Sequence, residues 1–145
     1  MDRALLSKCT CFAVRRTARA LTQMYDAALA PAGIRSTQYM VLAAIGERAD
    51  ISVHDLANAM VMDRTTMGRN LRLLERDGLV VINVAGSDRR RRDIALTRKG
   101  KMLLEGAYPL WKHAHDSLQK THGREFLDEF RGMLSKVSPN PQSAT

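Results

Sequence analysis

The sequence lacks the features of membrane proteins and of secreted, disulfide-linked domains. Its longest apolar run, Met40–Ile45, is far shorter than the roughly 20 residues that cross a bilayer. The N-terminus contains no continuous apolar segment of the kind that directs secretion. The two cysteines, Cys9 and Cys11, point to nearly opposite sides of a helix and so cannot bridge each other. We therefore expect a cytoplasmic protein in a reducing environment, with no membrane partner.

The motifs that mark common enzymes are missing as well. The sequence has no Gly-rich phosphate loop, no metal-ligand spacing and no nucleophile elbow. Cys9 and Cys11 form an i, i+2 pair, which cannot chelate one ion from a helix, even with His113 and His115 gathered nearby. We therefore predict that the protein is not an enzyme and holds no metal or other cofactor. A thiol-dependent peroxidase that uses Cys11 is the enzymatic alternative.

Positive charge is what the sequence has in excess. It contains 23 Lys and Arg against 15 Asp and Glu, a net charge of +8. Residues 63–99 alone hold ten basic and five acidic side chains, and residues 89–92 are four consecutive arginines. Such a balance favours a polyanionic partner, either nucleic acid or an anionic membrane surface. A membrane-surface helix has arginines opposite a bulky apolar face that enters the lipid. Here the apolar face of the arginine-bearing helix is needed for the core of the protein itself.

The first part of the chain is predicted to be one long helix. Residues 3–29 contain neither Gly nor Pro, and an apolar stripe runs from Val14 to Tyr25 at helical spacing. Such a helix spans ~40 Å, which exceeds what a small core can cover. We therefore expect part of it to pack on another subunit. Pro31 and Gly33 end this helix.

Capping residues divide the middle of the chain into three shorter helices. Ser36 or Thr37 can cap the first, and Ser52 with Asp55 fits the capping pattern that opens the second. After a tight turn at residues 61–62, Asp63 can cap the third helix, "RTTMGRNLRLLERD". In this third helix one apolar side faces a core, and arginines recur on another face. The apolar side consists of Met67, Leu71 and Leu74, and the basic face of Arg69, Arg72 and Arg76.

The chain then continues as a β-ribbon and two further helices. "LVVINV" and "DIALT" are predicted strands on either side of a turn at residues 86–93. Thr97 can cap a long helix that Pro109 should kink, and Gly123 separates it from a last helix. A polar tail at residues 139–145 is expected to be disordered.

Two helices joined by a tight turn and followed by a ribbon are typical of a winged helix-turn-helix. Its second helix can enter the major groove of DNA, and the basic tip of its ribbon can reach the adjacent minor groove. Arginine suits the tip because its planar fork pairs with phosphate and stays charged. The alternative is that residues 89–92 are a solvated, solubilising turn.

In "DRTTMGRNLRLLERDGLV" and "DRRRRDIALTRKG" the chain resembles the MarR family, over residues 9 to about 120. The family's wing pattern is matched by Asp88, Arg90, Leu96, Thr97 and Gly100. The resemblance implies that Arg90 enters the minor groove while Asp88 holds its guanidinium group. It also implies a homodimeric repressor that binds a pseudo-palindromic operator in double-stranded DNA.

The expected fold is mainly α with a small antiparallel β-wing, in a single domain over residues 1–138. Dimerisation helices are expected at about 3–30 and 98–137, and the winged helix-turn-helix at about 35–97. Ser52 and His54 are expected to support the helix-turn-helix. The expected DNA-binding residues are Arg64, Thr65, Thr66, Arg69 and Arg72 in the third helix, and Asp88, Arg89, Arg90, Arg91 and Arg92 in the wing.

Two triggers for release from DNA are compatible with the sequence. The first is a small aromatic or carboxylated effector in a crevice between the first helix, the second helix and the long fifth helix. Arg15 or Arg16 would bind its carboxylate, and Tyr39 and Trp111 would form the walls. The alternative reading is that Tyr39 and Trp111 are ordinary core residues.

The second trigger is oxidation of a thiol. The stretch "CFAVRRTARALTQMYDAALAPAGIRSTQY" resembles the organic hydroperoxide regulators, a branch of the MarR family. The resemblance places Cys11 at the reactive cysteine and Tyr39 at one of the tyrosines that bind its sulfur. Arg15 and Ser36 stand where that branch has two further tyrosines. The alternative is that both cysteines are structural, since cysteine is a common small apolar residue in cores.

Overall fold

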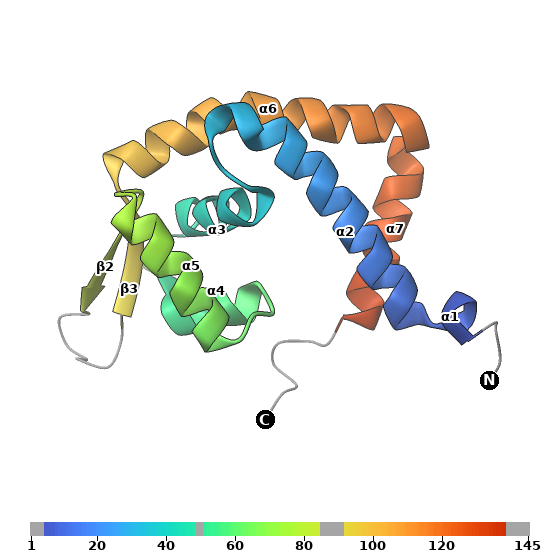
Figure 1. The fold of residues 1–145 in the computed structure, drawn as a ribbon, viewed down its shortest axis with the longest axis horizontal. Coiled ribbons are helices and arrows are strands. Elements are labelled where there is room, and N and C mark those ends of the chain that lie inside the picture. The colour runs from blue at the N-terminus through green and yellow to red at the C-terminus, as the bar shows by residue number, and fades with distance from the viewer. Residues whose placement is uncertain (1–4, 49–50, 85–91, 139–145) are drawn as a thin grey trace.

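The computed structural model describes residues 5–48, 51–84 and 92–138, and it confirms a mainly helical chain with a small antiparallel sheet. Figure 1 shows α6 running along the top of the view, with α3, α4, α5 and the sheet below one end and α7 below the other. The elements are α1 (Leu5–Lys8), α2 (Thr10–Leu29), η1 (Ala30–Ala32), α3 (Ser36–Gly46), β1 (Ile51–Ser52), α4 (Val53–Ala59), α5 (Arg64–Arg76), β2 (Val80–Val84), β3 (Arg92–Leu96), α6 (Arg98–His122) and α7 (Arg124–Val137).

The N-terminal helix is interrupted, which corrects the prediction of one helix from residue 3 to residue 29. α1 ends at Lys8, and Cys9 has an extended backbone with φ −84° and ψ 107° before α2 begins. No Gly or Pro marks this break, so the apolar spacing did not reveal it. At its other end α2 continues into a 3-10 turn, and Gly33 then adopts a left-handed φ of 72°.

The start of α3 also differs from the prediction, because neither Ser36 nor Thr37 is its cap. Arg35 is the N-cap residue, and Ser36 is the first, buried residue of the helix. The backbone N–H and the hydroxyl of Ser36 both donate to Asp26 Oδ1, each over 2.7 Å. These two hydrogen bonds, from the hydroxyl and then the amide, lower the pKa of Asp26. The serine therefore joins the end of α2 to the start of α3.

The predicted caps of α4 and α5 are confirmed. Ser52 Oγ accepts the Asp55 N–H over 3.0 Å, and Asp63 Oδ1 accepts the Thr66 N–H over 2.8 Å. The tight turn between these helices places Val61 at a positive φ of 50°, an uncommon conformation for a β-branched residue. These local hydrogen bonds set where each helix of the pair begins.

The sheet has three strands, one more than the predicted ribbon. β1 pairs with β3 on the side opposite β2, so the order is β1–β3–β2 and all pairs are antiparallel. Ile94 lies at the centre of the sheet, opposite Ile51 on one side and Ile82 on the other. Residues 86–91 of the turn predicted at 86–93 lie outside the described residues, and its last two residues, 92 and 93, belong to β3 instead.

We call residues 34–97 the lobe, because their helices and strands surround one apolar core. The predicted core side of α5, which comprises Met67, Leu71 and Leu74, is buried. It packs with apolar side chains from α3, α4 and the sheet. The buried members of this cluster are Val41, Leu42, Ile45, Ile51, Leu56, Ala57, Met67, Leu71, Leu74, Leu79, Val80 and Ile94.

α6 is joined to the lobe at its first turn. Thr97 caps the helix as predicted, because its hydroxyl oxygen accepts the Gly100 N–H over 3.0 Å while donating to the Gly78 carbonyl over 2.7 Å. A Cβ atom at position 100 would lie 2.0 Å from the Leu79 carbonyl oxygen, so only glycine fits. Pro109 lies inside α6, and the helix changes direction along its length in Figure 1.

The outer helices leave much of their apolar surface exposed. Of the described residues in α2 and α7, only Leu29 and Leu127 are buried. Large apolar side chains of both helices remain open to solvent, including Phe126, Met133 and Val137 at 52%, 54% and 71% exposure. Within the described part of the chain, no helix is both long enough and apolar enough to span a bilayer.

Candidate nucleic-acid interface

α5 presents a basic face to solvent because its apolar face is fully used in the core. Between the buried positions, Arg69, Arg72 and Leu73 are exposed, while Asn70 is half-buried. The five positions predicted to contact DNA from this helix, Arg64, Thr65, Thr66, Arg69 and Arg72, are all exposed. The helix therefore combines a fixed inner side with an outer side that is free to meet a partner.

The first turn of α5 is held by Asp63. Its Oδ1 accepts the Thr66 N–H over 2.8 Å, and its Oδ2 accepts the Thr66 hydroxyl over 2.6 Å. These hydrogen bonds, the hydroxyl first, lower the pKa of Asp63. Thr66 is thus exposed as predicted, but its hydroxyl hydrogen is already donated within the helix cap. Its role in the structure is to close the first turn.

Arg64 is held from the neighbouring helix. Its Nη2 atom lies 2.9 Å from Nδ1 of His54, and the side-chain amide of Asn58 lies 3.1 Å from Nε2 of the same ring. His54 and Ser52 were both predicted to support the helix-turn-helix. In the structure His54 contacts the start of α5, while Ser52 is buried and caps α4.

Further along α5 the arginines are partly engaged with the protein itself. Arg72 Nε donates to the Gly68 carbonyl oxygen over 3.2 Å. Arg76, at the end of the helix, forms an ion pair with Asp77 over 3.0 Å. Both contacts are exposed and contribute little free energy, so the two arginine side chains remain available to an anionic partner.

Most of the predicted wing tip falls outside the described residues. This holds for Asp88, Arg89, Arg90 and Arg91, while Arg92 begins β3 and its backbone pairs with that of Val84. The remaining members of the same motif have structural roles, of which only the cap formed by Thr97 was predicted from the sequence. Thr97 and Gly100 join α6 to the lobe, and Leu96 packs against the core of the lobe.

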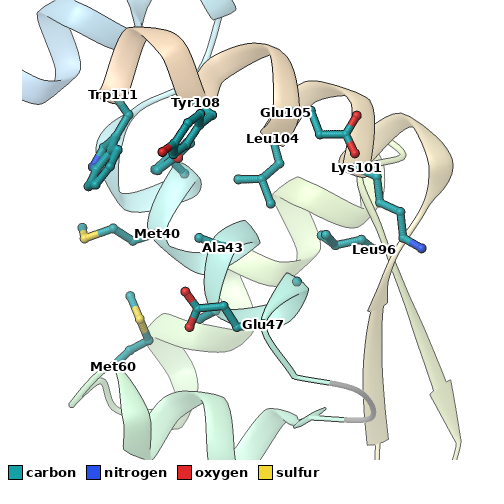
Figure 2. Close-up of a pocket in the computed structure, with 13 residues that line it drawn as sticks. Met40, Ala43, Glu47, Met60, Leu96, Lys101, Leu104, Glu105, Tyr108 and Trp111 are labelled. Atoms are coloured by element: carbon teal, nitrogen blue, oxygen red, sulfur yellow. The ribbon is translucent and has the colours of Figure 1, made fainter. Parts of the chain in front are cut away.

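A pocket of about 980 Å³ lies between α3 and α6. Figure 2 shows Trp111 and Tyr108 on α6 facing Met40 and Ala43 on α3 across this space. The lining is mostly apolar, with three charged side chains. It comprises Tyr39, Met40, Ala43, Ala44, Gly46, Glu47, Met60, Leu96, Lys101, Leu104, Glu105, Tyr108 and Trp111.

The residues predicted for an effector crevice are only partly brought together at this pocket. Tyr39 and Trp111 both line it, although Tyr39 is also buried in a small core cluster. Arg15 and Arg16 are exposed on α2 and do not belong to the lining, where Lys101 is the basic residue. Helical spacing alone did not show that α2 runs away from this space.

Trp111 is the centre of a stack of aromatic rings. Its ring lies 5.0 Å from His115, 6.0 Å from both Tyr39 and Tyr108, and 6.4 Å from Tyr25. Burial raises the pKa of the Tyr39 and Tyr25 hydroxyls. The stack therefore connects α2, α3 and α6 beside the pocket.

The cysteines form no site together. Cys11 is exposed on the first turn of α2, and Cys9 is half-buried in the extended residue before it. Among the residues that the structure describes, His, Cys, Asp and Glu side chains form no group that could hold a metal ion. The arrangement therefore offers one accessible thiol on the outer helix.

Comparisons with known proteins agree with this architecture. A sequence profile of the MarR family matches residues 32–91. The organic hydroperoxide resistance transcriptional regulator of Bacillus subtilis (strain 168) is 27% identical over 73% of this chain and 72% of its own length. The crystal structure of the M. tuberculosis transcriptional regulator MosR is 35% identical, with a TM-score of 0.78, over 91% of this chain and 96% of that one.

A third relative has been solved with its partners. The transcriptional repressor CouR bound to a 23-mer DNA duplex is 26% identical, with a TM-score of 0.85, over 96% of this chain and 99% of that one. CouR from Rhodococcus jostii RHA1 bound to p-coumaroyl-CoA matches over 94% of this chain and 95% of that one, with a TM-score of 0.78. All three relatives are regulators of transcription and none is an enzyme. The winged fold and these similarities show that the chain belongs to the MarR family of transcriptional regulators.

Proposed function

We propose that the protein is a homodimeric repressor that binds a pseudo-palindromic operator in double-stranded DNA. The observation that carries the proposal is the exposed basic face of α5, opposite a side that is fully buried in the lobe. A helix of this kind fits the major groove, where its first turns reach base edges. The similarity to CouR solved on a DNA duplex supports the same use of the fold.

In this proposal the wing completes the contact with DNA. Arg90 enters the minor groove beside the α5 site and Asp88 holds its guanidinium group, while Arg89, Arg91 and Arg92 approach phosphates. Phosphate contacts add affinity without reading sequence, so the arginine run strengthens binding to any duplex. Sequence preference then depends mainly on α5.

The second copy is proposed to cover the outer helices. α2 and α7 expose apolar side chains that include Phe12, Phe126 and Met133. Monomeric proteins rarely leave large contiguous apolar patches open to water. A two-fold dimer through these helices buries them and places two copies of α5 about 34 Å apart, one turn of DNA.

The pocket between α3 and α6 is proposed to bind a small aromatic or carboxylated effector that releases the DNA. Stacked rings around Trp111 fit a planar aromatic group. Lys101 shares the lining with Glu47 and Glu105, so a carboxylate would bind at the Lys101 end, near Leu96 in Figure 2. The complex of CouR with p-coumaroyl-CoA, whose acyl group is aromatic, supports this class of ligand.

The experiment that tests the proposed function is selection of bound duplexes from random DNA, followed by affinity measurements on the recovered sequence. Arg69→Ala should weaken binding to that sequence by about 1–3 kcal/mol, the usual value of a base-edge contact. Arg124→Ala removes the same charge from α7 and serves as the matched control. Recovery of no preferred sequence would overturn the proposal.

A second candidate trigger is peroxide, acting on Cys11. The exposed thiol on α2 and the similarity to the B. subtilis hydroperoxide regulator support it. The thiolate sulfur would attack the terminal oxygen of an organic hydroperoxide and break its O–O bond, which gives a sulfenic acid on the protein. The other oxygen leaves as an alkoxide that takes a proton from water to become an alcohol. Peroxide should then release wild-type protein from the selected duplex and leave Cys11→Ser bound. Equal behaviour of the two proteins would reject the redox trigger.

A further inference from the structure

The side chain of His54 forms a bridge between the two helices of the helix-turn-helix. His54 is the second residue of α4, and Arg64 is the first residue of α5. Arg64 Nη2 lies 2.9 Å from His54 Nδ1, and the amide group of Asn58 lies 3.1 Å from His54 Nε2. All three side chains are exposed. The ring therefore holds Arg64 in place at the start of α5, which is the end of the helix that is proposed to read bases.

Only one protonation state of His54 satisfies both contacts. A guanidinium group has donors and no acceptor, so a hydrogen bond from Arg64 requires a lone pair on Nδ1. The ring is then neutral, with its single proton on Nε2. Nδ2 of Asn58 is the amide atom nearest Nε2, and a half-turn of the amide brings its oxygen to that place, where it accepts the proton. The bridge thus depends on an uncharged imidazole.

A second proton on the ring removes the bridge. It would sit on Nδ1 and face the guanidinium group of Arg64, which sets two donors and two positive charges against each other. The nearby carboxylates are used in helix caps, since Asp55 accepts the Ser52 hydroxyl and Asp63 accepts the Thr66 hydroxyl. Protonation therefore releases Arg64 from α4.

We propose that His54 is a positioning residue that orders Arg64 for base readout only while its ring is neutral, so that the preference for operator over other DNA falls in acid. This inference rests on the proposed function. An arginine ordered before binding loses less side-chain entropy on the DNA.

The informative quantity is a ratio of affinities. A protonated His54 adds a positive charge, which strengthens binding to every duplex through phosphates. The same proton releases Arg64 and weakens discrimination between sequences. The test therefore compares the dissociation constant for the selected duplex with that for the same duplex carrying base substitutions under α5. Both are measured from pH 5.5 to pH 8 at constant salt of about 0.15 M.

Two substitutions distinguish the loss of the hydrogen-bond acceptor at position 54 from the protonation of the ring. His54→Asn keeps an acceptor oxygen close to the position of Nδ1 but cannot be protonated in this range. His54→Ala removes the acceptor. His113→Asn, at an exposed position on α6, removes an imidazole ring elsewhere and is the matched control.

For wild type and His113→Asn, the ratio should fall about threefold to tenfold between pH 8 and pH 5.5. His54→Asn should keep the high ratio throughout, and His54→Ala should show the low ratio at every pH. An unchanged pH slope in His54→Asn, or wild-type discrimination in His54→Ala at pH 8, would overturn the inference alone. A wild type that prefers no sequence at pH 8 would overturn the proposed function and the inference together.

Discussion

The lobe and the outer helices use the same kind of amphipathic sequence with opposite results. In the lobe, the apolar faces of α3, α4 and α5 pack with the sheet to form one core of twelve buried side chains. In the outer helices, the only buried side chains among the described residues are Leu29 of α2 and Leu127 of α7. Phe126 and Met133 of α7 are more than half exposed. The lobe is stabilised by contacts within one chain, whereas the outer helices leave apolar faces exposed that the proposed dimer would cover.

This contrast teaches that an apolar stripe predicts burial but not the partner that buries it. The stripe from Val14 to Tyr25 has helical spacing, yet Val14 is 42% exposed in the single chain. Damage to the lobe should change folding, and damage to the outer helices should change association.

The largest effect is expected at the junction of lobe and α6. Gly100→Ala places a Cβ atom 2.0 Å from the Leu79 carbonyl oxygen, so the backbone must move. We expect a loss of about 3 kcal/mol in the free energy of unfolding, measured by urea denaturation. Gly106→Ala on the same helix is the control, because its Cβ meets nothing within 4 Å. Equal stability of the two variants would contradict this account of the junction.

The next effect concerns the outer helices. Phe126→Glu puts a charge on the exposed apolar face of α7 and should weaken the proposed dimer by about 2 kcal/mol, roughly thirtyfold in its dissociation constant. Sedimentation equilibrium measures this change, and thermal melting at high protein concentration checks that the lobe stays folded. Met102→Glu changes a residue of α6 that is 62% exposed, and it should leave the dimer intact. A dimer insensitive to Phe126→Glu would place the interface elsewhere.

A smaller effect is expected from a single helix cap in the lobe. Ser52→Ala removes the hydroxyl that accepts the Asp55 N–H at the start of α4. The free energy of unfolding should fall by about 1 kcal/mol. Ser135→Ala in α7 removes an exposed hydroxyl that binds the Gly132 carbonyl, and a change within about 0.5 kcal/mol is expected there. If Ser135→Ala proves the more damaging, the two regions do not differ in the way described.

The smallest effect concerns the joint between the regions, where Asp26 binds Ser36. Hydrogen bonds from Ser36 lower the pKa of Asp26 in the folded protein. A carboxylate with a lowered pKa stabilises the fold above its unfolded pKa of about 3.9, and that stability is lost as the pH falls through the folded value. Asp26→Asn should therefore be slightly less stable at pH 7 and show a shallower loss of stability below about pH 4. Identical acid denaturation curves would remove this role for Asp26.

Local signals in the sequence predicted much of the lobe. Spacing identified the buried face of α5, and short polar patterns identified Ser52, Asp63 and Thr97 as caps. These features depend on residues within a turn or two of each other, so one sequence contains the necessary information. The basic face of α5 followed from the same periodicity, since whatever is not buried must face outward.

The features that were missed depend on contacts between distant residues. β1 is two residues long, too short for an alternating pattern, and exists because Ile51 pairs with Ile94. Ser36 does not cap α3 because Asp26, ten residues earlier, takes its hydroxyl. Lys101 lines the pocket whereas Arg15 and Arg16 do not, because α2 packs along α6 and contributes no side chain to the lining.

The proposal that two copies of α5 enter successive major grooves is tested most directly by half-site spacing. The duplex recovered by selection should contain two related half-sites about 10 base pairs apart. Inserting about five base pairs between them turns the second half-site to the other side of the helix. We predict that affinity at about 0.15 M salt then falls at least a hundredfold, toward non-specific binding. Undiminished affinity for the lengthened duplex would contradict the paired arrangement.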